Sequence, residues 1–134
     1  MRTAADIQDL FKPMLPGLLG IEFREVTQER VVAALKVRPD LCTTGGILHG
    51  GSIMAFADTL GAVGTSMNLK EGQGTTTVES STKFLAGAQV GTTVTAECTA
   101  FHRGRTTMVW QTLVKAESGK LCAVVTQTQL VLTR

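Results

Sequence analysis

One carboxylate stands out because of its surroundings in the sequence. Asp58 is the only ionisable side chain between residues 50 and 69, and it lies in the longest apolar segment of the chain, GSIMAFADTLGAVGTSMN. Burying an unpaired carboxylate costs several kcal/mol even after the protein relaxes around it. The placement indicates either acid–base or nucleophilic chemistry, or a structural aspartate bonded to a nearby hydroxyl of Ser52, Thr59 or Thr65.

A second feature precedes Asp58, at the point where a loop turns into the apolar segment. The run His49-Gly50-Gly51 places two glycines at the expected start of a helix. The first N–H groups of a helix lack intrahelical partners and carry the positive end of its dipole, so they can polarise a carbonyl or hold an oxyanion. Glycine lets a ligand approach the backbone closely. An ordinary glycine turn has the same appearance, so the pair alone is a weak signal.

The spacing relates these two features. Gly51 and Asp58 are seven positions, or two helical turns, apart, so they lie on the same helix face with about 10 Å between them along the axis. A carbonyl held at the helix start cannot also touch the carboxylate of the same helix. The spacing therefore predicts a homodimer in which Asp58 of one subunit meets the Gly51 amide of the other across antiparallel helices.

The elements that must position these residues follow from apolar periodicity. We expect one domain over residues 1–134, with a short N-terminal helix at about 4–15 that Pro16-Gly17 ends, a loop at 38–48 and a long helix at about 51–68. The apolar residues of the long helix point in nearly every direction, which predicts burial all round. The predicted strands alternate apolar and polar residues and cover about 20–27, 30–37, 75–85, 92–102, 106–116 and 121–132.

This order of elements predicts an α+β fold. The last four strands are joined by short turns, which implies an antiparallel sheet that packs against the long helix in two layers. We expect an irregularity in the first strand near Glu25. Gly61 and Gly64 each weaken a helix by roughly 1 kcal/mol, and we expect them where another backbone approaches closely, either a strand or the same helix of a partner.

Composition excludes several function classes. The chain has 13 basic and 11 acidic residues without a run of either, so it offers no footprint for a nucleic acid. Cys42, Cys98 and Cys122 are odd in number and lack CxxC spacing, which argues against disulfides or zinc and favours small buried residues in a reducing cytosol. Asp6 and Asp9 do not suit a signal peptide, and no stretch is long enough for a membrane span. We expect a cytoplasmic protein that makes no membrane contact.

The segment GGILHGGSIMAFADTLG resembles the signature of hotdog-fold acyl-CoA thioesterases of the phenylacetate-degradation and 4-hydroxybenzoyl-CoA type. The downstream segments HRGRTTMVWQTLV and ESGKLCAVVTQTQLVL resemble the last two strands of that family, so the resemblance covers about residues 19–132. It implies a hotdog fold, in which a long central helix is wrapped by a curved antiparallel β-sheet. It also implies that two subunits join their sheets, with active sites at the interface, and that dimers often pair into tetramers.

The resemblance also implies roles for individual residues. Asp58 matches the catalytic acid, as nucleophile or as general base for water. Gly51 matches the residue whose backbone N–H polarises the thioester carbonyl, with Gly50 close by in the substrate-binding site. His49 matches the motif histidine that positions the substrate, although a histidine that caps the loop is the alternative.

Two positions depart from the family pattern. Thr43 stands where the family usually carries Asn or Gln, which puts the polar contact to substrate or water in doubt. Ala62 stands where a helper Ser or Thr often follows the acid. In related subfamilies the helper comes from the next strand, where Thr77 is the best match and Thr76 its neighbour. Threonine is also an ordinary strand residue.

Coenzyme A carries phosphates that need cationic partners. Arg103 and Arg105 lie in a turn between strands and are the best candidates, with Thr106 adjacent and Lys83 as a further candidate. Solvated turn charges are the alternative interpretation of these residues.

These observations predict an enzyme that hydrolyses an acyl-CoA or aryl-CoA thioester to the free acid and CoA. It would need no cofactor or metal, because CoA is part of the substrate and the only histidines are His49 and His102. Two other functions remain open: a non-catalytic protein that binds acyl-CoA or a small ligand, and a hotdog dehydratase, which would need a histidine as acid–base partner. Medium acyl, phenylacetyl and hydroxybenzoyl chains all fit the sequence.

Overall fold

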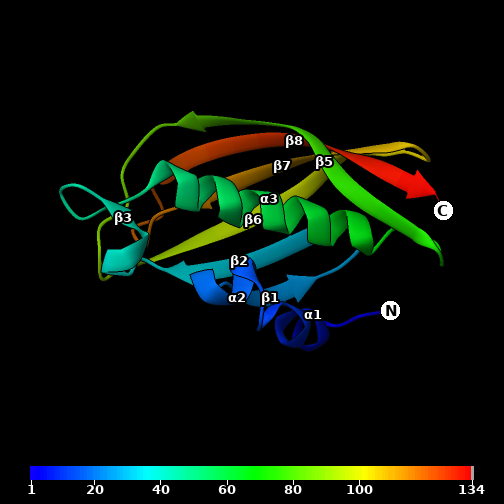
Figure 1. Cartoon of the computed structure of the whole chain (residues 1–134). Coiled ribbons are helices and arrows are strands. Elements are labelled where there is room, and N and C mark those ends of the chain that lie inside the picture. The colour runs from blue at the N-terminus through cyan, green and yellow to red at the C-terminus, as the bar shows by residue number, and fades with distance from the viewer. Residues whose placement is uncertain (134) are drawn as a thin grey trace.

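The long helix α3 (Gly50–Ser66) lies lengthwise across one face of a six-stranded antiparallel sheet (Figure 1). This arrangement comes from a computed structural model of the chain, which describes residues 1–133. The order of strands across the sheet is β1-β2-β6-β7-β8-β5. Their bounds are β1 (Glu22–Val26), β2 (Arg30–Lys36), β5 (Gln73–Phe84), β6 (Thr93–Arg103), β7 (Thr107–Lys115) and β8 (Leu121–Thr133). The expected two-layer α+β architecture is confirmed.

The strands follow the period-two pattern of their sequences. In β7, half-buried and buried residues alternate, and Met108, Trp110, Thr112 and Val114 are the buried ones. Side chains that alternate along a strand point to opposite faces of the sheet, so one face packs on α3. The irregularity expected near Glu25 is present, because the register of β1 on β2 shifts between residues 23 and 25.

The place of β5 in the sheet differs from the sequence expectation. Short turns between consecutive strands suggested that β5 and β6 would be neighbours, but β5 pairs with β8, and β6 lies between β2 and β7. Residues 85–92 therefore cross three inter-strand gaps, about 14 Å at the usual spacing. The loop before α3 holds this connection in place, since the Leu48 N–H donates to the Ala88 carbonyl and the Val90 N–H to the Gly46 carbonyl.

The N-terminal segment forms two short helices, α1 (Ala4–Phe11) and α2 (Leu15–Leu19), in place of the single helix expected over residues 4–15. Pro16 lies in the first turn of α2, where its missing N–H has no intrahelical acceptor to lose, so it begins a helix here. Thr3 and Asp6 form a capping box at the start of α1.

The loop before α3 is more ordered than the sequence suggested. It contains a single 3-10 turn, η1 (Pro39–Leu41), and a two-stranded hairpin of β3 (Cys42–Thr43) and β4 (Ile47–Leu48). The hairpin delivers the chain directly to the first residue of α3, so the loop has a defined path into the helix.

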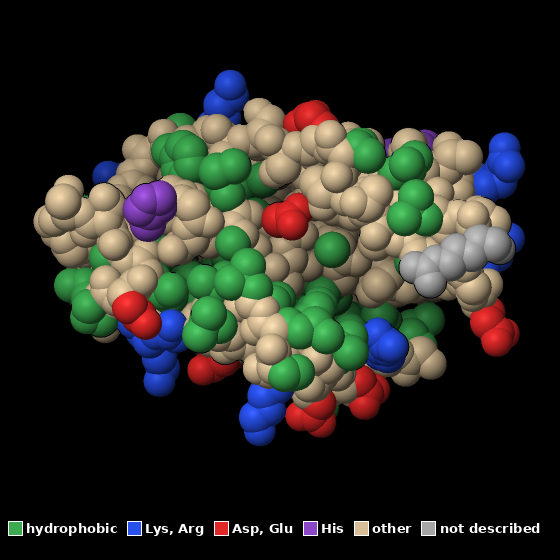
Figure 2. Space-filling view, in the orientation of Figure 1, with side chains coloured by type: hydrophobic (Ala, Val, Ile, Leu, Met, Phe, Trp, Pro, Cys, Tyr) green, Lys and Arg blue, Asp and Glu red, His purple; other side chains and the backbone are tan. Residues whose placement is uncertain are grey.

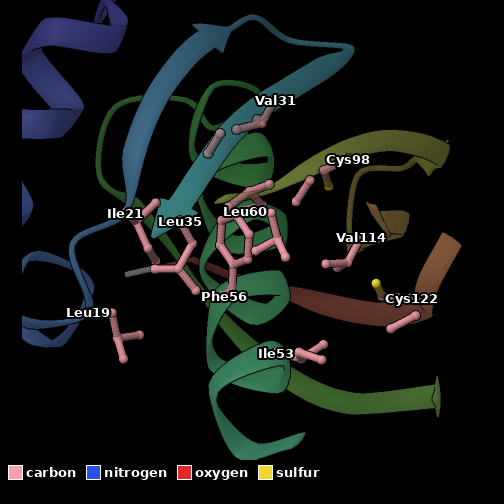
Figure 3. Close-up of a cluster of buried hydrophobic side chains, with 14 of the residues drawn as sticks. Leu19, Ile21, Val31, Leu35, Ile53, Phe56, Leu60, Cys98, Val114 and Cys122 are labelled. Carbon is pink, nitrogen blue, oxygen red and sulfur yellow. The ribbon is translucent and has the colours of Figure 1, made fainter. Parts of the chain in front are cut away.

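The hydrophobic core fills the space between α3 and the sheet. Phe56 and Leu60 of α3 lie with Leu35 of β2 in one cluster of buried side chains (Figure 3). Gly61 and Gly64 face the sheet, where a Cβ on Gly61 would overlap the amide of Gln127. A Cβ on Gly64 would lie 2.7 Å from the Trp110 ring. These glycines therefore admit large side chains of β8 and β7, where we had expected a neighbouring backbone.

The expectation that α3 is buried all round is wrong for the single chain. The sheet covers only one side of the helix, and the opposite side is exposed or half-exposed. We call that side the open face of α3, and it carries Gly51, Met54, Ala55, Asp58 and Ala62. Figure 2 shows hydrophobic side chains gathered on this side of the molecule. Among residues 1–133, no helix has both the length and the apolar character needed to cross a membrane.

Candidate active site

Asp58 projects from the open face of α3 and is half-exposed in the single chain, although the sequence predicted its burial. Its Oδ1 accepts a hydrogen bond of 2.7 Å from the Thr77 hydroxyl of β5. No Lys, Arg or His among residues 1–133 forms an ion pair with Asp58. The carboxylate is therefore held by one hydroxyl and is not neutralised by a structural cation.

The three hydroxyls that could have held Asp58 as a purely structural residue form hydrogen bonds with other groups. Ser52 donates to the Leu41 carbonyl at 2.9 Å, and Thr59 donates to the Ala55 carbonyl at 2.7 Å. The Thr65 hydroxyl accepts from the Trp110 indole N–H at 2.8 Å. None of these three hydroxyls forms a hydrogen bond with Asp58, so the partner that the structure provides is the strand residue Thr77.

A β-bulge in β5 lies next to this contact. The register of β5 on β8 shifts between Thr77 and Glu79, so Val78 is the extra residue. Bulges re-aim side chains and are frequent beside active sites. Thr77 points toward α3, whereas Thr76 is exposed on the other side of the strand. The structure thus brings Thr77 to Asp58 and separates Thr76 from it.

Two buried glutamines of β8 lie behind Thr77. The Gln129 side chain is 0% exposed and its Nε2 donates to the Thr77 hydroxyl at 2.5 Å and to Gln127 Oε1 at 2.6 Å. Gln127, 1% exposed, donates from Nε2 to the Ala57 carbonyl of α3 at 2.8 Å. Sequence reasoning missed both residues. The sequence did contain a signal for them, because the period-two pattern of β8 places both glutamines on its buried face, where amide side chains are unusual.

The start of α3 distinguishes the two glycines of the His-Gly-Gly run. His49 caps the helix, and its Nδ1 accepts the Gly51 N–H at 2.7 Å. An Nδ1 that accepts a hydrogen bond carries no proton, so the neutral ring is protonated at Nε2. The Gly50 N–H has no acceptor among residues 1–133. Gly50 therefore presents the available donor, while the Gly51 donor is occupied.

Two predicted binding residues lie at this end of α3. Thr43 is exposed in the hairpin that leads into the helix. Lys83 is exposed near the end of β5. Its neighbour Phe84 covers Gly50, since a Cβ on Gly50 would lie 3.1 Å from the Phe84 ring. Both residues are within the same part of the fold as the free Gly50 N–H.

Arg103, Arg105 and Thr106 lie at the opposite end of α3. Arg103 donates to the Asn68 side chain at 3.2 Å and forms an ion pair of 3.7 Å with Glu29. Arg103 and Arg105 line an open pocket of about 390 Å³ that also includes Lys70. A helix of 17 residues is about 25 Å long, so one chain does not bring these cations to its own Gly50.

Known proteins share both the sequence and the fold. A family model described as the thioesterase superfamily matches residues 45–123. A 1,4-dihydroxy-2-naphthoyl-CoA hydrolase from Listeria monocytogenes is 29% identical over 110 residues, which cover 82% of this chain and 89% of that protein.

Two crystal structures of thioesterases superpose closely on the chain. The structure of a thioesterase from Haemophilus influenzae gives a TM-score of 0.93 at 29% identity and covers 99% of this chain and 92% of its own. That of a mutant thioesterase from Pseudomonas aeruginosa gives a TM-score of 0.92 at 27% identity, with 98% and 95% covered. The likeness therefore extends over nearly the whole of each chain.

Proposed function

The chain belongs to the thioesterase superfamily and is a thioester hydrolase with the hotdog fold, and on that premise we propose that it hydrolyses acyl-CoA or aryl-CoA thioesters through Asp58. Membership of this family sets aside the two other functions considered from the sequence, a non-catalytic binding protein and a dehydratase. The CoA ester named for the relative from Listeria monocytogenes supports a CoA thioester as the substrate class. The proposed reaction uses no cofactor, since CoA is part of the substrate and is released as one of its two products.

The observation that carries this proposal is the unequal environment of the two Asp58 oxygens. Oδ1 accepts the Thr77 hydroxyl, and Oδ2 has no hydrogen-bond partner among residues 1–133. A carboxylate held by one oxygen on a half-exposed surface has the other available for a reacting molecule. Asp58 then acts as general base for water or as nucleophile.

In the general-base route, Asp58 takes a proton from water while the water oxygen adds to the thioester carbon. The tetrahedral oxyanion accepts a hydrogen bond from a backbone N–H at the start of α3. We assign that donor to Gly50, because the Gly51 N–H is occupied by His49. The C–S bond then breaks, and the CoA thiolate accepts the proton from the Asp58 carboxyl group. In the nucleophilic route the carboxylate adds to the thioester carbon first, and the C–S bond breaks to release CoA thiolate. Water then cleaves the resulting anhydride to the free acid and the Asp58 carboxyl group, whose proton goes to the thiolate. His49, exposed beside Gly50, would position the substrate.

The spacing along α3 supports a site shared by two subunits. Gly50 and Asp58 are eight positions apart, about 12 Å along the helix axis, so one thioester group does not touch both in a single chain. In a homodimer with antiparallel α3 helices, the open face of one subunit covers that of the other. This pairing also carries Arg103, Arg105 and Thr106 of one subunit toward the helix start of its partner, where the CoA phosphates would bind.

Replacing Asp58 by asparagine tests the proposed reaction. We expect Asp58→Asn to lower kcat for thiol release from a panel of medium acyl-, phenylacetyl- and hydroxybenzoyl-CoA by about 10²–10⁴-fold, the usual contribution of a general base. The fold should persist, because asparagine has the same size and keeps an acceptor for Thr77; an unchanged Tm is the control. Undiminished turnover would remove Asp58 from the reaction.

Proline in place of Gly50 removes this N–H without requiring a different backbone conformation at His49. Proline is tolerated at the first position of a helix, and His49 has the extended conformation that a following proline requires (φ −63°, ψ 139°). We expect Gly50→Pro to lower kcat by about 10²–10³-fold, as for the loss of one oxyanion donor. Gly50→Ala is the matched control, because it adds a Cβ at the same place and keeps the N–H. Equal losses in the two variants would point to crowding against Phe84 and not to the donor.

The same variants test whether the site is shared. Neither Asp58→Asn nor Gly50→Pro should be active alone. In a mixed dimer, one subunit carries Asp58→Asn and the other carries Gly50→Pro. Because each site takes Asp58 from one subunit and Gly50 from the other, one site then contains both changes and the other contains neither. Coexpression of the two variants should therefore restore activity. A mixture that stays inactive, or a protein that sediments only as a monomer, would contradict the shared site.

A further inference from the structure

The hydrogen bonds behind Asp58 form a continuous chain with a fixed direction. They run from the Ala57 carbonyl through Gln127, Gln129 and Thr77 to Asp58. From this chain we infer that Gln129 is a positioning residue, which sets the direction of the Thr77 hydroxyl and through it orients the Asp58 carboxylate. The inference rests on the proposed role of Asp58 and adds residues that contact neither substrate nor reacting atoms.

The orientation of the whole chain is fixed at its first member, the Ala57 backbone carbonyl. A backbone carbonyl only accepts hydrogen bonds, so the Gln127 atom 2.8 Å from the Ala57 oxygen must be Nε2. The Gln127 Oε1 therefore faces Gln129. Because an oxygen again requires a donor, Gln129 must turn its own Nε2 toward Gln127, at 2.6 Å.

Gln129 then has one N–H left, and it points at Thr77. Both amide protons of Gln129 are used, one on Gln127 and one on the Thr77 hydroxyl oxygen. The Gln129 Oε1 faces the Thr75 hydroxyl at 2.9 Å, whose one proton is shared between this oxygen and the Leu130 carbonyl oxygen at 3.0 Å. Since Thr77 already accepts from Gln129, its single hydroxyl proton is free to go to Asp58 Oδ1 at 2.7 Å. Each member has a unique orientation.

Packing prevents the glutamines from turning over. Gln127 and Gln129 are 1% and 0% exposed, so solvent does not reach them to replace a partner. Gly61 of α3 lies directly against the Gln127 amide, and a Cβ there would overlap it. A buried amide whose bonds are reversed would leave donors facing donors, which is costly in a site without water.

The consequence for Asp58 is a fixed orientation. A donor held in one direction on Oδ1 fixes the plane of the carboxylate, so that Oδ2 also points in one direction. Without Gln129, the Thr77 hydroxyl loses the partner that holds it in place and no longer fixes that plane. A poorly oriented base loses rate at the chemical step while substrate binding is unaffected.

The variant Gln129→Met tests this assignment, because methionine has a similar length and no N–H. We expect kcat for thiol release from phenylacetyl-CoA to fall at least about tenfold at constant KM. Gln111→Met is the matched control. Gln111 belongs to β7, is half-buried and forms no side-chain hydrogen bond within residues 1–133, so the kcat and KM of Gln111→Met should match the wild type.

A double variant separates positioning from general damage. Thr77→Val should lose activity, and Thr77→Ser, which keeps the hydroxyl, should retain it within a few-fold. If Gln129 acts only through Thr77, the pair Thr77→Val and Gln129→Met should fall no more than about two-fold below Thr77→Val alone. If the loss of kcat in the double variant equals the product of the losses in the two single variants, the inference is overturned. If Gln129→Met does not fold, Gln127→Met removes the anchor on Ala57 and should likewise lower kcat at constant KM.

The outcomes for the two proposals are distinct. An active Asp58→Asn enzyme would overturn the proposed function itself. An inactive Asp58→Asn enzyme together with a wild-type kcat for Gln129→Met would leave that function in place and overturn only the positioning role.

Discussion

The two sides of α3 are built from neighbouring residues but have opposite properties. The side toward the sheet is filled, with Phe56 and Leu60 fully buried and Gly61 in contact with the Gln127 amide. The open face carries Met54, which is 41% exposed, and the half-exposed Asp58. Close packing leaves no volume for a ligand on the first side, so the chemistry lies where the fold leaves the helix uncovered.

This contrast also explains how the two sides cooperate. The buried side does not contact substrate in our proposal, yet the amides that orient Thr77 lie there, behind the helix. The open face supplies the reacting carboxylate, and the buried side supplies the rigid support for it. Rigid support of a reactive group is what keeps its geometry productive.

Truncation on the buried side should give the largest loss of stability. Phe56 is 0% exposed, so Phe56→Ala leaves a cavity in the core cluster. We expect it to lower the free energy of unfolding by about 3–5 kcal/mol, which urea denaturation followed by circular dichroism would measure. A loss below about 1 kcal/mol would mean that this side is less tightly packed than the structure indicates.

The same kind of truncation two residues earlier should have a much smaller effect on stability. Met54 lies on the open face, which the proposed dimer would cover, so Met54→Ala leaves no cavity in the core of the subunit. We expect it to lower the free energy of unfolding by only about 1 kcal/mol. Because the Met54 side chain is apolar and lies on the face of Asp58, we expect KM to rise for thioesters with long apolar acyl chains, measured by thiol release. A destabilisation equal to that of Phe56→Ala would remove the distinction between the two faces.

Local patterns in the sequence predicted much of the fold. Period-two alternation located the six strands of the main sheet to within a few residues, and the apolar segment gave the long helix. Helical spacing also placed Gly51 and Asp58 on one face, as the structure confirms. The pattern did not reveal the break between α1 and α2, because Pro16 can end one helix or begin the next.

The candidate site was only partly predictable. Thr77 was identified through the family resemblance, but its contact with Asp58 depends on the pairing of β5 with β8 and on the bulge at Val78. The choice between Gly50 and Gly51 as donor depended on where the His49 side chain points. Neither the order of strands nor the direction of a cap follows from the spacing of residues along the chain.

The sequence alone determined which residues share a face: Asp58 with the helix start, and Gln127 and Gln129 with the core positions of β8. Spacing determines this because helices and strands have fixed periods of 3.6 and 2 residues. Only the tertiary structure decided that β5 lies beside β8, which puts Thr77 between Asp58 and Gln129. Residues about 50 positions apart in the chain meet there, and such contacts arise from packing of the whole domain, which local periodicity does not encode.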